Sequence, residues 1–186
     1  SDLNAAGLRA EWVNGDTARE IEPRLSDSIT GGTLHQDCIQ MDPKLFMQAI
    51  SNAAKTEGVT ILHQNQATGM NLTDGRVSGV TLEDGSILQC SSVVLATGAW
   101  TKKIMSEWLG YDLPVEPHGL QKVHISLDIG TPLKCAVRWN SVNIVSRKDG
   151  LVHAGSKYDP AGFNSKPSEE TRDWLLAQVA EIMPGF

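Results

Sequence analysis

The sequence has little of what several protein classes need. Its 186 residues include three cysteines, Cys38, Cys90 and Cys135, an odd number at wide spacings, which indicates reduced thiols rather than a disulfide framework. The longest strongly apolar run, residues 93–96, is far short of the roughly 20 residues of a membrane-spanning helix. No charged stretch followed by an apolar one marks a secretion signal. We therefore expect a cytoplasmic protein without a membrane span.

Positive charge is also scarce. Lys and Arg number 16 against 22 Asp and Glu, which gives a formal net charge of -6, and the basic residues are scattered along the chain. A nucleic-acid partner is not expected, because backbone phosphates are bound by clustered Lys and Arg. Hydrophobic residues at 40% and charged residues at 20% are typical of a globular chain with one sizeable core or two small ones.

The common catalytic and nucleotide-binding signatures are absent. No G-x-G occurs, so the dinucleotide-binding fingerprint is missing, and there is no phosphate-binding loop, H-E-x-x-H or G-x-S-x-G. His35 and Cys38 have the spacing of half a zinc site, but without a second pair we favour a surface histidine near a buried thiol. His118, between Pro117 and Gly119, is the most site-like histidine, although an ordinary loop position is favoured.

The patterns predict a mixed α+β or α/β fold. Asp42 and Pro43 are typical of a helix start, and the apolar stripe that follows predicts a helix over residues 43–56, closed by Gly58. A short strand is expected at residues 59–63. Two Asp-Gly turns then predict a three-stranded meander from residue 66 to residue 90.

The run 93–96 is apolar on both faces, which indicates a strand covered on both sides of its sheet. A helix with Ile104, Met105, Trp108 and Leu109 inward is expected at residues 101–109. The rest predicts β segments and a last helix that begins after the capping residue Ser168 and ends near Ile182 with Trp174, Leu175 and Val179 buried. The β segments are expected near Val123 to Leu127, Ala136 to Trp139, Asn143 to Ser146 and Leu151 to Gly155, with a turn at Lys148-Asp149-Gly150.

The order of these blocks resembles the FAD-dependent D-amino acid oxidase family, to which glycine oxidase and sarcosine oxidase belong. The resemblance extends over most of the chain from about residue 20. It is carried by Asp42-Pro43 with its helix, Gly58 to Ile61, Val77 to Val80, Asp84-Gly85, Val93 to Trp100, Leu113 to Pro117, Ile144 to Gly150, Gly155-Ser156 and Met183-Pro184.

The resemblance implies which residues lie against FAD. The segment A-x-G-x-W closes the FAD-binding domain in that family, and a position near the adenine end matches Ala67. The residues implied to bind the cofactor are Ala67, Ala96, Thr97, Gly98, Ala99 and Trp100. From the residues alone, two readings of the segment stay open: a ligand site, or a turn at Gly98 with Trp100 packed in the core.

The resemblance also divides the chain. Residues 1–36 and 101–186 are expected to form the substrate-binding domain, with a largely antiparallel sheet, and residues 37–100 to form part of the FAD-binding domain. A tyrosine of glycine-oxidase-like members falls near Asn143, so glycine is not predicted as the substrate. Asn143, Arg147 and Tyr158 are the expected substrate-binding residues, and no catalytic residue is named.

The expected function is that of a fragment of a flavin-dependent oxidoreductase that acts on the C–N bond of a small amine or amino acid. FAD is expected in the full-length protein and only weakly, or not at all, in these 186 residues, because the phosphate-binding glycines are absent. Two alternatives stay open. One is a flavin dehydrogenase of the same fold with a glycerol-phosphate or 2-hydroxy acid substrate, and the other is a non-catalytic α/β binding module.

Overall fold

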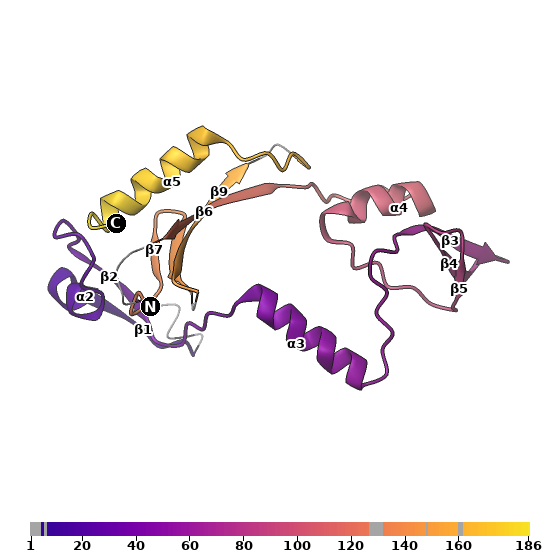
Figure 1. Ribbon diagram of the computed structural model, residues 1–186, viewed down its shortest axis with the longest axis horizontal. Coiled ribbons are helices and arrows are strands. Elements are labelled where there is room, and N and C mark those ends of the chain that lie inside the picture. The colour runs from indigo at the N-terminus through magenta and orange to yellow at the C-terminus, as the bar shows by residue number, and fades with distance from the viewer. Residues whose placement is uncertain (1–4, 6, 127–131, 148, 160–161) are drawn as a thin grey trace. The chain divides into compact units, whose positions relative to one another are not determined.

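The computed structural model describes residues 5, 7–126, 132–147, 149–159 and 162–186 (Figure 1). The chain divides into two compact units, one of Ser1–Asp42 with His118–Phe186 and one of Pro43–Pro117. The borders expected from the sequence lay instead after residues 36 and 100. Residues 101–109 stay with the turn before them because the Thr101 hydroxyl donates to the Gly98 carbonyl oxygen at 2.8 Å. The assignment of the units to cofactor and substrate remains a prediction.

The unit of residues 43–117 contains the predicted helices and the predicted meander. The three strands form an antiparallel sheet in the order β3-β4-β5. At the first turn Asp74 and Gly75 have φ of 51° and 74°, the left-handed pair that a tight hairpin requires. The elements are α3 (Pro43–Thr56), β3 (Ala67–Thr73), β4 (Arg76–Leu82), β5 (Ile87–Gln89), the short 3₁₀ helix η1 (Gly98–Trp100) and α4 (Thr101–Leu109).

Two predicted strands of this unit, residues 59–63 and 93–96, are wrong for this structure. Neither segment pairs with a strand among the described residues, and an extended segment without a hydrogen-bonded neighbour is not a strand. The side chain of Val94, predicted to be buried, is 88% exposed. Leu45, Phe46 and Ile50 on the apolar stripe of α3 are also exposed. The apolar side chains of α3 and of residue 94 are therefore not packed against other residues of this unit.

The unit of residues 1–42 and 118–186 is built on a four-stranded antiparallel sheet in the order β6-β9-β8-β7. This confirms the largely antiparallel sheet predicted for the second half. Leu127 and Lys148, predicted in a strand and a turn, lie outside the described residues. The strands are β6 (Gly119–Ser126), β7 (Val137–Trp139), β8 (Val142–Ser146) and β9 (Leu151–Asp159).

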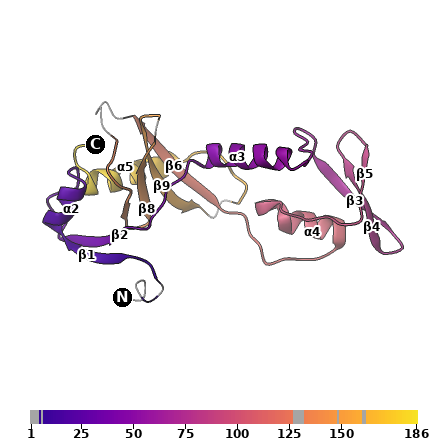
Figure 2. The same cartoon turned by 90° about the horizontal axis from the view of Figure 1, so that it is seen from below.

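One face of this sheet packs against the last helix, α5 (Glu169–Ile182), as both views show (Figures 1 and 2). Ser168 caps the helix as predicted, since its hydroxyl accepts a hydrogen bond from the Thr171 amide at 3.3 Å. The core between helix and sheet is formed by apolar side chains. Its buried members are Leu133, Val142, Ile144, Val152, Ala154, Leu175, Val179, Ile182 and Met183.

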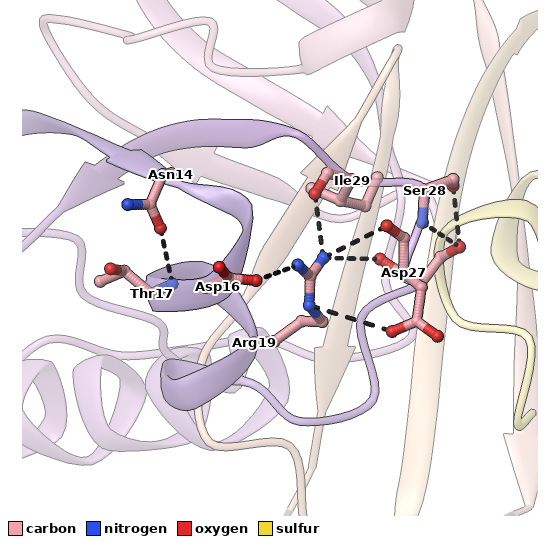
Figure 3. Close-up of polar contacts among 8 residues, drawn as sticks. Asn14, Asp16, Thr17, Arg19, Asp27, Ser28 and Ile29 are labelled. Atoms are coloured by element: carbon pink, nitrogen blue, oxygen red, sulfur yellow. Dashed lines mark hydrogen bonds and ion pairs between the residues drawn. The ribbon is translucent and has the colours of Figure 1, made fainter.

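The first forty residues form elements that the sequence patterns did not predict. They are β1 (Ala10–Asn14), α2 (Gly15–Ile21) and β2 (Gly31–His35), with β1 and β2 antiparallel. The Arg19 guanidinium holds this segment together, donating to Asp16 at 2.6 Å and to the Ile29 carbonyl oxygen at 2.9 Å (Figure 3). Gly15 is required here, because a Cβ would collide with that same carbonyl oxygen.

A buried carboxylate joins this segment to the sheet unit. Glu22, directly after α2, is fully buried. One carboxylate oxygen accepts a hydrogen bond from the Lys134 amide at 2.7 Å, and the other accepts one from the Arg24 guanidinium at 3.1 Å. The Ser26 amide adds a bond of 2.8 Å to the Ile182 carbonyl oxygen at the end of α5. These contacts place residues 22–26 against the edge of the core.

We predict that Glu22→Gln destabilises the protein by about 3 kcal/mol. The amide removes the charge opposite Arg24, and in either orientation its NH2 group faces another donor, the Lys134 N–H or the Arg24 guanidinium. Breaking a buried pair costs about 3 to 5 kcal/mol. We expect the lower end of this range of destabilisation, because the Arg24 side chain is 21% exposed and water can solvate part of its charge. Urea unfolding measures the effect, with the exposed Glu20→Gln as matched control, expected within about 0.5 kcal/mol of the unmodified protein. Equal stability of the two variants would contradict the assigned role.

Candidate functional site

The predicted cofactor residues 96–100 form an exposed turn whose side chains alternate in exposure. Ala96, Gly98 and Trp100 are exposed, whereas Thr97 and Ala99 are half-buried. The Thr97 and Thr101 hydroxyl oxygens are 3.0 Å apart, and the Thr97 carbonyl oxygen accepts from the Trp100 amide at 3.1 Å. The turn is therefore held by hydrogen bonds of Thr97 and Thr101, and it exposes Ala96, Gly98 and Trp100.

Two observations bear on whether this turn is a ligand site or a structural turn with Trp100 packed in the core. Gly98 has a φ of 54°, and a Cβ built on it would meet no atom within 4 Å, so backbone conformation rather than crowding calls for glycine. Trp100 is 57% exposed, so its reading as a core residue is wrong here. Ala96 and Gly98 allow a flat ligand to approach the backbone, and the residues present fit a flavin cofactor in this respect. Their contact with FAD stays a prediction.

Ala67, the remaining predicted cofactor residue, is the first residue of β3. Its Cα pairs with that of Leu82 on β4, and its methyl group is exposed. The Glu83 amide donates to the Gln66 carbonyl oxygen at 2.8 Å, which fixes the start of this strand. A small exposed residue at a fixed strand start is compatible with the contact to the adenine end that the resemblance implies.

The predicted substrate residues share one face of the other unit's sheet. Val142 and Ile144 on β8 are fully buried against α5, so Asn143 between them points to the opposite face. We call this opposite face the polar face. Its members on the four strands are Leu120, Lys122, His124, Arg138, Asn143, Val145, His153, Gly155 and Tyr158, and Arg147 follows at the end of β8.

Tyr158 reaches the polar face because of its neighbours on β9. The ammonium of Lys157 lies 5.3 Å from the ring centroid of Trp174 on α5, so Tyr158, the next residue along the strand, points away from the helix. The Tyr158 hydroxyl is 2.7 Å from Nε2 of His118, and the two rings lie 4.5 Å apart. His118 therefore has a hydrogen-bonded aromatic partner, and whether the pair contacts a substrate stays a prediction.

Arg147 is held by two carboxylates. Its guanidinium is 2.7 Å from a carboxylate oxygen of Asp42 and 3.0 Å from one of Asp149. The pairing with Asp42 ties the end of the N-terminal segment to the sheet. Of the three predicted substrate residues, Arg147 thus has its charge already neutralised, whereas Asn143 and Tyr158 remain exposed.

A stacked histidine pair was missed by the sequence analysis. His124 and His153 face each other across β6 and β9, with ring centroids 3.9 Å apart and planes within 3° of parallel. Nε2 of His153 is buried and has no hydrogen-bond partner among the described residues. Histidines 29 positions apart show no pattern in the sequence, and the strand register brings them together.

We predict that His153 makes the stability of the protein depend on pH. Burial, and after it the charges of His124, Arg147 and Lys122, lower the pKa of His153 below its ordinary value of 6.5, while Asp149 acts in the opposite direction. The unfolded chain therefore takes up this proton first as the pH falls. The stabilising contribution is complete above pH 6.5 and is lost as the pH falls toward the lower pKa of the folded protein.

Melting temperatures between pH 5 and pH 8 check this effect. The fall below pH 6.5 is expected to be smaller in His153→Gln, while the exposed control His35→Gln keeps the slope of the unmodified protein. An identical slope in all three proteins would rule out His153 as its source.

The histidine and cysteine considered as half a zinc site are both on the surface. His35 is exposed as predicted, whereas the prediction that the Cys38 thiol is buried is wrong, since Cys38 is exposed too. No group of three metal-ligating side chains occurs among the described residues. No helix among them has the length and apolar character to cross a membrane.

Comparison with known proteins gives one family and a consistent set of relatives. The family model described as DAO, FAD dependent oxidoreductase, matches residues 1–186. The chain is 27% identical to the bifunctional protein ThiO/ThiG of Synechocystis over 185 residues, 97% of this chain and 27% of that protein. It is 29% identical to the glycine oxidase of Pseudomonas putida over 150 residues, 77% of this chain and 38% of that protein.

The fold agrees with solved structures. The crystal structure of glycine oxidase from Geobacillus kaustophilus superposes with a TM-score of 0.86 and 22% sequence identity, over 98% of this chain and 48% of that one. The chain thus spans about half of this solved structure and a smaller share of the two relatives above. The mixed α/β architecture with antiparallel sheets that the sequence predicted is confirmed.

Proposed function

Because this chain belongs to the DAO family of FAD-dependent oxidoreductases, we propose that the complete protein oxidises the C–N bond of an amino acid or secondary amine. The observation that carries the proposal is the polar face, on which Asn143 and the Tyr158–His118 pair are exposed together. The similarity to a glycine oxidase over 77% of the chain supports an amine substrate. The exposed apolar residues of α3 and Val94 suit a cofactor unit that further protein completes.

In this proposal the exposed turn 96–100 and Ala67 hold the cofactor. Ala96 and Gly98 let it approach the backbone, and the exposed ring of Trp100 offers it an apolar surface. FAD held by these residues would supply the acceptor for a hydride from the carbon that bears the substrate nitrogen. The contribution of the protein is orientation and electrostatics.

The side chains of the polar face orient the substrate and hold its proton. The Asn143 amide has both a donor and an acceptor for a polar group of the substrate. The Tyr158 hydroxyl can receive a proton from the substrate ammonium and pass its own to Nε2 of His118, 2.7 Å away. An amine must be neutral to release a hydride readily, so this pair serves the step before oxidation.

A substrate panel tests the function. FAD-loaded complete protein is mixed without oxygen with glycine, sarcosine and proline, and in parallel with glycolate and lactate, while the flavin absorbance is followed. We expect the absorbance to bleach with at least one amine, and the rate to fall about 100-fold or more in Tyr158→Phe, which keeps the ring but removes the proton-transferring hydroxyl. Bleaching by the hydroxy acids alone would replace the amine proposal with the hydroxyl alternative, and bleaching by neither would reject both.

A glycine substitution tests the cofactor contact at residues 96–100. Gly98→Asn retains a residue that tolerates positive φ but adds a side chain, so we predict a clear loss of FAD affinity with a small effect on stability. Gly98→Val adds backbone strain, which costs on the order of 1 to 3 kcal/mol. FAD titration of the complete protein measures the loss of affinity, and the melting temperature of the cofactor-free complete protein measures the effect on stability.

Gly85→Asn is the matched control, because Gly85 also has positive φ, open space around its Cβ and a place in the same unit. It is expected to leave FAD affinity unchanged. If Gly98→Asn also leaves the affinity unchanged, Gly98 is a turn residue and residues 96–100 do not contact the cofactor.

A further inference from the structure

The chain passes between its two units twice, after residue 42 and after residue 117. At both crossings the flanking residue of the sheet unit, residues 1–42 and 118–186, is held by a side chain of that same unit. Asp42 is bound by Arg147, and His118 is bound by Tyr158. The proposed function gives His118 and Tyr158 a role in proton transfer, but it leaves Arg147 without one.

Arg147 is fixed within the turn between β8 and β9. Its amide donates to the Leu151 carbonyl oxygen at 2.8 Å, and its own carbonyl oxygen accepts from the Gly150 amide at 3.2 Å. Its Nε is 3.0 Å from one carboxylate oxygen of Asp149, and the other oxygen of that carboxylate accepts from the Leu151 amide at 3.2 Å. Backbone and side chain of Arg147 are thus both held independently of Asp42.

A second nitrogen of the same guanidinium holds Asp42. Nη2 of Arg147 is 2.7 Å from a carboxylate oxygen of Asp42, and the two side chains are only 29% and 22% exposed. An ion pair that is largely shielded from water is stronger than one on the open surface. The planar guanidinium offers its donors in a rigid fork, so it can hold Asp42 and Asp149 in one defined arrangement.

Asp42 is the residue from which α3 starts. Pro43 is the first residue of this 14-residue helix, and a residue that precedes a proline is restricted to extended conformations. The helix itself is stiff, because each turn is hydrogen-bonded to the next. The position of Asp42 therefore determines where α3 leaves the sheet unit, and Arg147 determines the position of Asp42.

We infer that Arg147 is a positioning residue for the proposed oxidation, which it serves by anchoring Asp42 at the first crossing. The inference rests on the proposed function, in which the polar face of one unit and the cofactor residues 67 and 96–100 of the other serve one reaction. Arg147 acts through Asp42 and does not bind the substrate, since two carboxylates already neutralise its charge. This role replaces the substrate contact expected from the sequence.

Asp42→Asn in the FAD-loaded complete protein tests the anchor. Asparagine caps a helix as well as aspartate does, so α3 keeps its cap while the ion pair is lost. We expect amide hydrogen exchange in residues 41–46 to become about tenfold faster, because a hydrogen bond to a charged group is removed. At saturating amine the rate of flavin reduction is expected to fall about tenfold, with KM and FAD affinity unchanged, because the reacting groups are less well placed.

Two further variants accompany this one. Arg147→Lys keeps the charge but loses the rigid fork, so its exchange and reduction rates are expected to lie between those of Asp42→Asn and the unmodified protein. Asp37→Asn is the matched control, because it breaks the ion pair of Asp37 with Arg9 in the same N-terminal segment, away from both crossings. It is expected to change neither rate.

A substrate-binding role of Arg147 predicts a different result. Arg147→Lys would then raise KM, Asp42→Asn would change KM by freeing the guanidinium, and the rate at saturation would stay the same in both. This pattern would overturn the inference, as would unchanged exchange in Asp42→Asn, or faster exchange with an unchanged reduction rate. If no amine reduces the flavin of the unmodified protein, the proposed function fails, while hydrogen exchange still decides whether Arg147 anchors the crossing.

Discussion

The buried carboxylate of Glu22 is the contact on which the arrangement of the sheet unit depends. It joins the end of α2 to the backbone at Lys134, 112 positions further along the chain, and it is neutralised in place by Arg24. A charge without water must be paired, so this geometry admits little variation. With α5 and residues 22–29 on one side of the sheet, the other face is the one that presents polar side chains.

The polar character of that face follows from strand alternation. Each of β6, β7, β8 and β9 places an apolar residue toward α5 and the next residue on the polar face. Side chains from distant segments, such as Lys122, Asn143 and Arg138, thereby form one row. The same alternation explains why His124 and His153 stack. The register shift between Gln121 and Lys122, opposite residues 155–157 of β9, turns Lys157 toward α5 and Tyr158 to the polar face, where it meets His118. The buried apolar residues of one face and the polar residues of the other both result from this alternation.

In the unit of residues 43–117, by contrast, segments with an apolar pattern are not buried by other residues of the described chain. The stripe on α3 and the run 93–96 have the composition of buried elements, yet Leu45, Phe46 and Val94 are exposed. The helix forms without cover because its capping and backbone hydrogen bonds are local, whereas a strand needs a neighbour for every bond it makes. This difference explains why the prediction of residues 43–56 is confirmed and that of residues 59–63 is wrong.

The sequence by itself determined the elements whose signals are local. The helix start at Pro43, the meander with its Asp-Gly turns, the Ser168 cap and the antiparallel strands after residue 118 were all predicted, as was the family resemblance. The small elements before residue 36 escaped prediction, because Arg19 and Glu22 stabilise them through contacts with distant backbone. Asn143, Arg147 and Tyr158 were identified one by one. Only the tertiary structure decided that they share a face with Lys122, Arg138 and the histidine pair, because strand register is set by packing across the whole sheet.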